Sequence, residues 1–158
     1  INGRFSKRQK EVYNAVLRVM KGATAMLLPG TLMATYHEEV GELMTLELIQ
    51  LGLITKEEVN TYKTTKKGLP PYKKYFMHGT SHFLGLDVHD VGNRYVPMQD
   101  GMVFTVEPGI YIPEENIGVR IENDVLVTSD KPLDLMARIP REVEEIEEIM
   151  NSKVVIGS

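Results

Sequence analysis

Three of the four histidines, His78, His82 and His89, lie in the short stretch MHGTSHFLGLDVHD at 77–90. Two glutamates follow in strand-like segments, Glu107 in VFTVEPG and Glu122 in GVRIEND. Neutral imidazole and carboxylate together suit Mn, Fe, Co or Zn. Paired carboxylates that bridge two metal ions are a known arrangement for activating water at neutral pH. These residues therefore predict most of a two-metal hydrolytic site.

The surroundings of His82 and Glu107 suit metal ligands. Gly79 and Gly85 would let the backbone turn tightly around His82. Glu107 precedes Pro108-Gly109, which predicts a bend straight after the strand. We therefore expect the Glu107 carboxylate to stand at a strand terminus.

Glu122 has an arginine two residues before it and an aspartate two residues after it. Because side chains alternate along a strand, Arg120, Glu122 and Asp124 would share one face of a single strand. Arg120 would then keep the Glu122 carboxylate ionised and oriented. His78 and His89 could bind a developing oxyanion or carry a proton. From spacing alone, a metal site and a metal-free polar network of histidines both remain open.

His37 is the fourth histidine and lies in the sequence HEEVG at 37–41. The two-histidine zinc motif requires a second histidine where this chain has Gly41. We therefore interpret His37 as a surface or core residue.

The pattern of apolar, capping and turn residues predicts helices first, then an antiparallel β region, then a final helix. We expect a first helix that Ser6 and Gln9 begin with a capping box and that ends before Pro29, and a second helix at about 32–52. A short helix begins with a capping box of Thr55 and Glu58, and an exposed loop follows at 61–71. The β-rich segments are 102–106 and 119–128, and an acidic helix follows at 141–150. This order predicts an α+β fold.

Composition limits the classes of function. A length of 158 residues suits one domain, and the net charge of −4 gives no electrostatic reason to expect nucleic acid. The absence of cysteine excludes disulfides and thiolate metal sites. No apolar run is long enough to cross a bilayer, and the start has no hydrophobic signal core. We expect a cytoplasmic protein with no membrane or nucleic-acid partner.

The motif HGTSHFLGLDVHD at 78–90 resembles that of the Xaa-Pro aminopeptidases (aminopeptidase P) and proline dipeptidases. The segments GMVFTVEPGIYI at 101–112 and GVRIENDVLVT at 118–128 resemble the same family. NGRFSKRQKEVYNAVL at 2–17 is similar to the helix that follows the family's aspartate-bearing hairpin. The resemblance covers nearly the whole chain and implies a partial pita-bread fold.

The resemblance also implies roles for individual residues. His82 resembles the metal-ligating histidine, Glu107 a metal-ligating glutamate that can also transfer protons, and Glu122 the glutamate that bridges two metals. His78 and His89 resemble the histidines that bind substrate and handle protons. Arg120 resembles the arginine that orients the site. The implied cofactor is a pair of divalent ions, most typically Mn²⁺.

The family's site requires two more aspartates, from a hairpin before the first helix. We expect residues 1–158 to be the C-terminal portion of an M24-type metallopeptidase catalytic domain, with that hairpin and the family's N-terminal domain absent. With an incomplete set of ligands, this portion alone should bind metal weakly and be inactive or nearly so.

The resemblance leaves three functions open. The implied activity is release of the N-terminal residue from peptides with proline at the second position. A proline dipeptidase shares the motifs and differs in substrate length. A non-catalytic pita-bread binding module is the third reading, although the retained His82, Glu107 and Glu122 argue against it for a complete protein. Family members often assemble, so a homo-oligomer is an expectation. Phe83, Tyr95 and Tyr111 are candidates for the proline pocket by type only, with core packing favoured.

Overall fold

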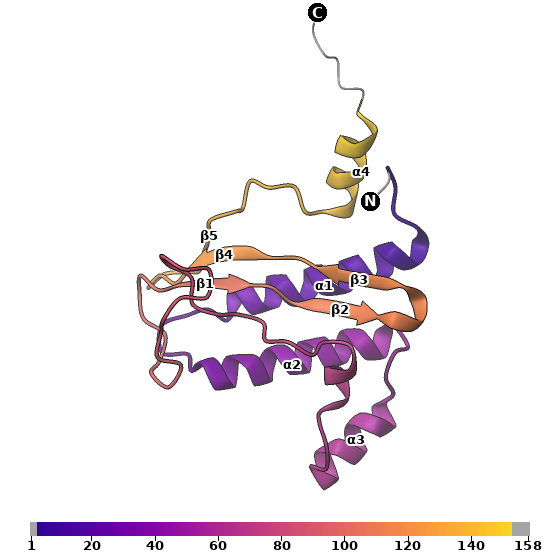
Figure 1. The fold of residues 1–158 in the computed structure, drawn as a ribbon, viewed down its shortest axis with the longest axis horizontal. Coiled ribbons are helices and arrows are strands. Elements are labelled where there is room, and N and C mark those ends of the chain that lie inside the picture. Colours follow the sequence, from indigo (N-terminus) through magenta and orange to yellow (C-terminus); the bar gives the residue numbers. More distant parts are fainter. Residues whose placement is uncertain (1–2, 153–158) are drawn as a thin grey trace, which may run out of the picture.

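The computed structural model describes residues 3–152 as helices on one side of short antiparallel strands (Figure 1). The elements are α1 (Lys7–Ala25), α2 (Met33–Gln50), α3 (Lys56–Thr65), the 3₁₀ helix η1 (Pro71–Lys74), β1 (Val103–Val106), β2 (Gly109–Ile112), the 3₁₀ helix η2 (Pro113–Glu115), β3 (Ile117–Arg120), β4 (Asn123–Leu126), β5 (Leu133–Asp134) and α4 (Val143–Asn151). The predicted α+β order is confirmed.

Capping boxes begin two of the helices as predicted. The Gln9 main-chain N–H donates to Ser6 Oγ at 3.2 Å, and the Ser6 N–H donates to Gln9 Oε1 at 2.8 Å. Thr55 and Glu58 make the same reciprocal pair at the start of α3. Each box satisfies two main-chain donors that a helix start would otherwise leave without partners.

The prediction of an exposed loop over 61–71 was wrong at both ends. α3 continues to Thr65, and η1 begins at Pro71. The hydroxyls of Thr64 and Thr65 donate to the carbonyls four residues earlier, so these polar side chains are compatible with the helix. Helix α3 ends where Lys66 adopts a left-handed conformation with φ of 52°.

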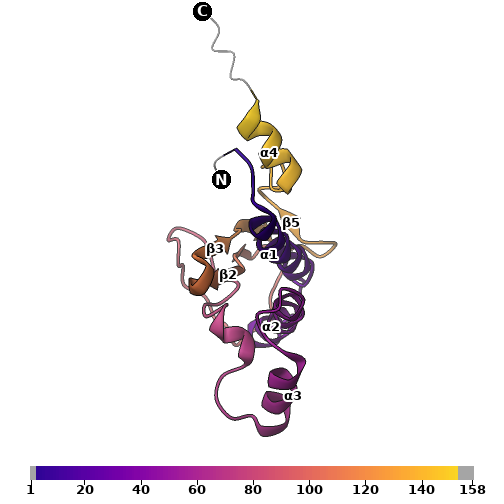
Figure 2. The ribbon, with the colours of Figure 1, turned by 90° about the vertical axis from the view of Figure 1, so that its right-hand side faces the viewer.

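The core lies between the helices and the strands. α1 and α2 run side by side, and the strands cover one face of this pair, as the end-on view shows (Figure 2). The largest fully buried side chains come from both layers: Val12, Val16, Val19, Met20, Leu27, Tyr36, Val40, Met44, Leu48, Phe104, Ile110 and Ile112. The helices thus supply the packed support on which the strands rest.

The acidic helix α4 is joined to α1 by polar contacts. Lys10 pairs with Glu147 at 2.9 Å, and Lys21 pairs with Glu142 at 2.6 Å. The predicted helix is confirmed, and the basic and acidic ends of the described chain partly neutralise each other.

The strands form a two-part ribbon with one interruption. β1 pairs with β4 through Val106↔Asn123, and β2 pairs with β3 through Gly109↔Arg120. The two ladders have the same register. If it is continued through the residues between them, Glu107 lies opposite Glu122 and Pro108 lies opposite Ile121. Proline has no N–H to donate to a ladder, and the two sheets separate at this point.

The interruption corrects one sequence prediction. The β-rich segment 119–128 is divided between β3 and β4, which belong to different sheets. Arg120 and Asp124 therefore lie in separate strands, and Glu122 lies in the gap between them. Hydrophobic alternation continues through the gap, which is why the sequence pattern did not reveal it.

Within residues 3–152, no helix is long and apolar enough to span a membrane.

Replacing Phe104 by alanine should lower the free energy of unfolding by about 3–5 kcal/mol, because it removes a large side chain that is 1% exposed. Leu46 on α2 has a side chain that is 58% exposed, so Leu46→Ala is the control. It should change the free energy of unfolding by about 0.5 kcal/mol or less. Urea unfolding of both variants measures the difference. Equal effects would show that Phe104 is not a core residue.

Candidate metal centre

The segment 80–84 lies along β1 on the side away from β4. The Glu107 N–H donates to the Thr80 carbonyl at 2.7 Å, the Thr105 N–H donates to the His82 carbonyl at 3.1 Å, and Phe83 bridges to Phe104. Residues directly opposite in antiparallel strands project to the same face. His82 therefore faces the same side as Thr105, and Glu107, two residues further along the chain and just past the end of β1, shares that face.

Register alone thus predicts that three potential ligands converge. His82, Glu107 and Glu122 each offer a ligand atom, and these atoms lie within 4.8 Å of one another. His82 Nε2 is 3.3 Å from Glu107 Oε1. The Glu107 side chain is 15% exposed and that of Glu122 is 39% exposed, so the group opens to solvent on the Glu122 side.

The tautomer of His82 follows from one hydrogen bond. Nδ1 lies 2.9 Å from the Phe83 carbonyl oxygen. Because a carbonyl only accepts, Nδ1 carries the hydrogen, and in the neutral ring Nε2 keeps its lone pair. This lone pair is on the nitrogen that faces Glu107. Such an arrangement is the usual one for a metal-ligating histidine.

Helix α2 holds the His82 segment from the other side. Tyr36 and Ser81 share a buried hydrogen bond of 2.8 Å between their hydroxyl oxygens. Burial raises the pKa of Tyr36, so its hydroxyl stays protonated. The His82 N–H also donates to Thr105 Oγ1 at 3.2 Å. His82 is therefore fixed to both the helix layer and β1.

Arg120 lies close to both carboxylates. Its Nε is 3.9 Å from Glu107 Oε2 and 3.7 Å from Glu122 Oε2. These separations are longer than hydrogen bonds, and the Arg120 side chain is 52% exposed, so its stabilising effect is modest. Two glutamates directly opposite each other repel. A cation between them would relieve that repulsion.

The donor set suits a divalent cation. It combines two carboxylates with an imidazole nitrogen that has an available lone pair, and it contains no sulfur. Such ligands are compatible with Mn²⁺, Fe²⁺, Co²⁺ or Zn²⁺. The residues present therefore fit part of a metal centre, as the sequence predicted.

His78 lies outside this group of three and pairs with a tyrosine. His78 Nδ1 is 2.7 Å from the Gly79 carbonyl, so Nδ1 carries the hydrogen in the neutral ring. The Tyr111 hydroxyl then donates to His78 Nε2, at 3.0 Å. From the sequence, Tyr111 was a candidate by residue type only. A contact between a strand residue and a histidine 33 positions earlier leaves no signal in local sequence patterns.

His89 lies beside the group but not in it. Its ring centroid is 4.3 Å from that of His82, and the rings are near edge-to-face. His89 is exposed, on a loop that returns toward Phe83.

A cavity of about 440 Å³ adjoins His82 and His89 and reaches α2. His37 of α2 also lines it, and its side chain is half-buried, which agrees with its interpretation as a surface or core residue. His37 Nε2 is buried and has no hydrogen-bond partner among the described residues. Burial lowers the pKa of His37, and the cations Lys73 and Arg94 act in the same direction. The ring is therefore neutral at pH 7.

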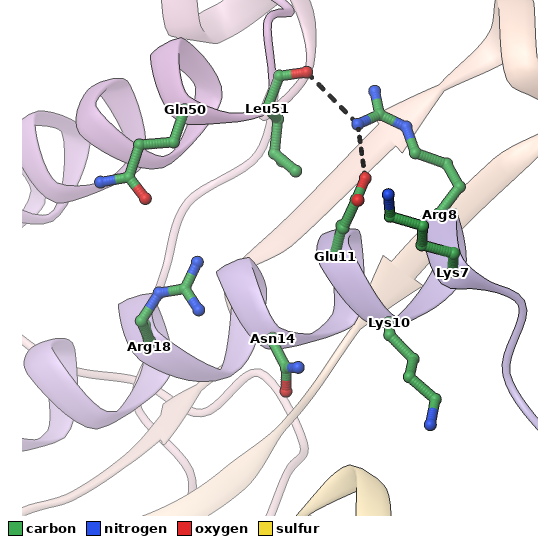
Figure 3. Close-up of a pocket in the computed structure, with 8 residues that line it drawn as sticks. All are labelled: Lys7, Arg8, Lys10, Glu11, Asn14, Arg18, Gln50 and Leu51. Carbon is green, nitrogen blue, oxygen red and sulfur yellow. Dashed lines mark hydrogen bonds and ion pairs between the residues drawn. The ribbon is translucent and has the colours of Figure 1, made fainter.

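A larger hollow of about 590 Å³ lies elsewhere, along α1 near the end of α2 (Figure 3). Its arginines already have acidic partners: Arg8 pairs with Glu115 at 2.7 Å, and Arg18 pairs with Glu47 at 2.6 Å. This hollow contains none of the sequence-predicted site residues.

Comparison with known proteins defines the class. The model of metallopeptidase family M24 matches residues 1–129, which is most of the chain. The chain therefore belongs to metallopeptidase family M24. Xaa-Pro aminopeptidase 3 of Rattus norvegicus is 42% identical over 160 residues, which cover 94% of this chain and 30% of that protein. The Xaa-Pro aminopeptidase of Haemophilus influenzae is 40% identical over 163 residues, which cover 96% and 37%.

Solved structures agree with the sequence matches. Pseudomonas aeruginosa aminopeptidase PepP is 38% identical with a TM-score of 0.82, and Zn-substituted Escherichia coli aminopeptidase P in complex with product is 37% identical with a TM-score of 0.80. Each match covers 94% of this chain and 36% of the other. The partial pita-bread prediction is confirmed. The chain spans about a third of the length of these relatives.

His37→Gln should reduce the loss of stability on acidification. Because the folded-state pKa of His37 is lowered, the unfolded chain binds its proton first as pH falls below about 6.5. The parent therefore loses free energy of unfolding in that window, and the variant lacks this contribution. Urea unfolding at pH 7.5 and pH 5.5 compares the two, and equal losses would contradict the burial of a neutral His37.

Proposed function

We propose that this chain supplies part of the active site of an Xaa-Pro aminopeptidase that uses two divalent metal ions, most typically Mn²⁺. The observation that carries the proposal is the convergence of His82, Glu107 and Glu122 within 4.8 Å on one face of the ribbon. Membership of family M24 and identities of about 40% to Xaa-Pro aminopeptidases support it.

His82, Glu107 and Glu122 would hold the metal ions, and Glu122 would be the ligand that the ions share. Bound divalent ions supply Lewis acidity that lowers the pKa of water and polarises a peptide carbonyl. Two further carboxylates from outside this chain complete the site in this proposal. The chain alone would accordingly bind metal weakly and show little or no turnover.

The chain's other polar residues act on the substrate and its protons. His89, beside His82, would bind the substrate carbonyl oxygen or move a proton at a ring nitrogen. His78 would do the same with its ring orientation fixed by Gly79 and Tyr111. Glu107 would also carry a proton, and Arg120, whose Nε lies near both carboxylates, would orient them.

The proposed substrate is a peptide with proline at its second position. Proline has no N–H, so a site that cleaves before it cannot depend on that donor. The proposed setting is the cytoplasm, with self-association into a homo-oligomer.

In the complete protein that contains this chain, His82→Ala should lower kcat/KM for an Xaa-Pro tripeptide more than about a hundredfold, because a metal ligand is lost. Glu114→Gln, an exposed acid on η2 whose side chain is 62% exposed, is the control and should keep full activity. Activity assays with metal analysis check both. Near-normal turnover of His82→Ala with intact metal content would refute the assigned site.

Glu122→Gln in the same protein should abolish turnover with little change in the free energy of unfolding, because it removes the proposed bridging charge.

Cleavage of tripeptides and Xaa-Pro dipeptides by the parent, measured side by side, identifies the substrate class. Cleavage restricted to dipeptides would make the protein a proline dipeptidase. No cleavage of either, with metal bound, would contradict the proposed function.

A further inference from the structure

The loop that carries His89 is not held in place by apolar packing. Leu86 is fully exposed, Val91 is 91% exposed and Val88 is 69% exposed. His89 itself is also exposed. Its position beside His82 must therefore depend on polar contacts or on the main chain.

Asp90 supplies those contacts. Its Oδ2 accepts the Leu86 N–H at 2.8 Å, and its Oδ1 accepts the Val91 N–H at 2.7 Å. Its own N–H donates to the Phe83 carbonyl at 3.1 Å. One half-buried residue thus closes the loop from Phe83 to Val91, and His89 is its immediate neighbour.

The Phe83 carbonyl joins this loop to the metal centre. The same oxygen accepts hydrogen bonds from His82 Nδ1 at 2.9 Å and from the Asp90 N–H. Phe83 is itself fixed, because its ring packs against Phe104 with centroids 4.7 Å apart. A line of contacts therefore runs from the core through Phe83 to both His82 and the His89 loop.

Two glycines make this arrangement possible. A Cβ on Gly85 would collide with Asp90 Oδ2, and a Cβ on Gly92 would collide with the Phe83 ring. A larger residue at either position would therefore require the Asp90 carboxylate or the Phe83 ring to move.

We propose that Asp90 is a positioning residue that holds His89 beside His82. The proposal rests on the proposed function for its catalytic consequence, but the loop geometry stands without it. A carboxylate is required because it accepts at both oxygens. Asparagine offers one acceptor and would turn an NH₂ group toward a main-chain N–H.

The test compares Asp90→Asn with Asp87→Asn in the complete protein. Asp87 lies in the same loop, its side chain is exposed, and its change to asparagine removes the same charge. Asp90→Asn should lower kcat for an Xaa-Pro tripeptide about tenfold to a hundredfold, because catalytic geometry is lost, with KM changed about twofold or less. Asp87→Asn should keep the parent kcat.

A double-mutant cycle separates positioning from general damage. If Asp90 acts through His89, Asp90→Asn should lower kcat no further in a His89→Ala background. A tenfold loss that persists in that background would overturn the proposal, as would an unchanged kcat for Asp90→Asn in the parent. Gly85→Ala, which displaces the Asp90 carboxylate, should reproduce the loss of kcat and provides a second variant if Asp90→Asn folds poorly.

A structural measurement distinguishes this proposal from the proposed function. Amide hydrogen exchange at Leu86 and Val91 should accelerate in Asp90→Asn and not in Asp87→Asn, and NMR contacts between the His82 and His89 rings should weaken. If the parent cleaves no Xaa-Pro peptide, the proposed function fails while these measurements still decide the role of Asp90. Unchanged exchange and ring contacts would refute it.

Discussion

The candidate centre depends on the shared register of two short antiparallel ladders. That register sets Glu107 opposite Glu122 at the point where Pro108 interrupts the pairing. Two like charges directly across a ribbon are unfavourable, and Arg120 offsets them only in part, at 3.7–3.9 Å. His82 lies on the same face, because segment 80–84 pairs with the edge of β1 that is opposite β4. Strand pairing therefore brings together a candidate cation-binding group whose members, His82 and Glu122, are 40 positions apart in the sequence.

The helices make that assembly rigid. α1 and α2 pack behind the strands, and Phe104 ties β1 to the core while its ring also supports Phe83. Tyr36 reaches from α2 to Ser81, next to His82. The candidate ligand atoms thus lie next to strands and helices whose positions are fixed by burial, whereas His89 lies on an exposed loop whose shape comes from hydrogen bonds. The centre combines a rigid part with a part that polar contacts must organise.

Local signals in the sequence predicted much of this arrangement. The capping boxes at Ser6 and Thr55 and the apolar periodicities gave the helices, because both are encoded within a few residues. The three-residue group was predicted from residue types and from resemblance. The division of segment 119–128 was missed, because hydrophobic alternation continues through the gap. The Tyr111–His78 bond and the cavity position of His37 were also missed, since both depend on tertiary packing between distant segments.

The most direct test of the central claim is paramagnetic NMR of this chain during titration with Mn²⁺. If His82, Glu107 and Glu122 form one metal-binding group, their signals should broaden first and together, at lower Mn²⁺ than those of the acidic helix α4. The same titration of His82→Ala should lose this selective broadening. Broadening that begins in α4, or that affects all acidic residues equally, would contradict the claim that strand register builds a metal centre on this face.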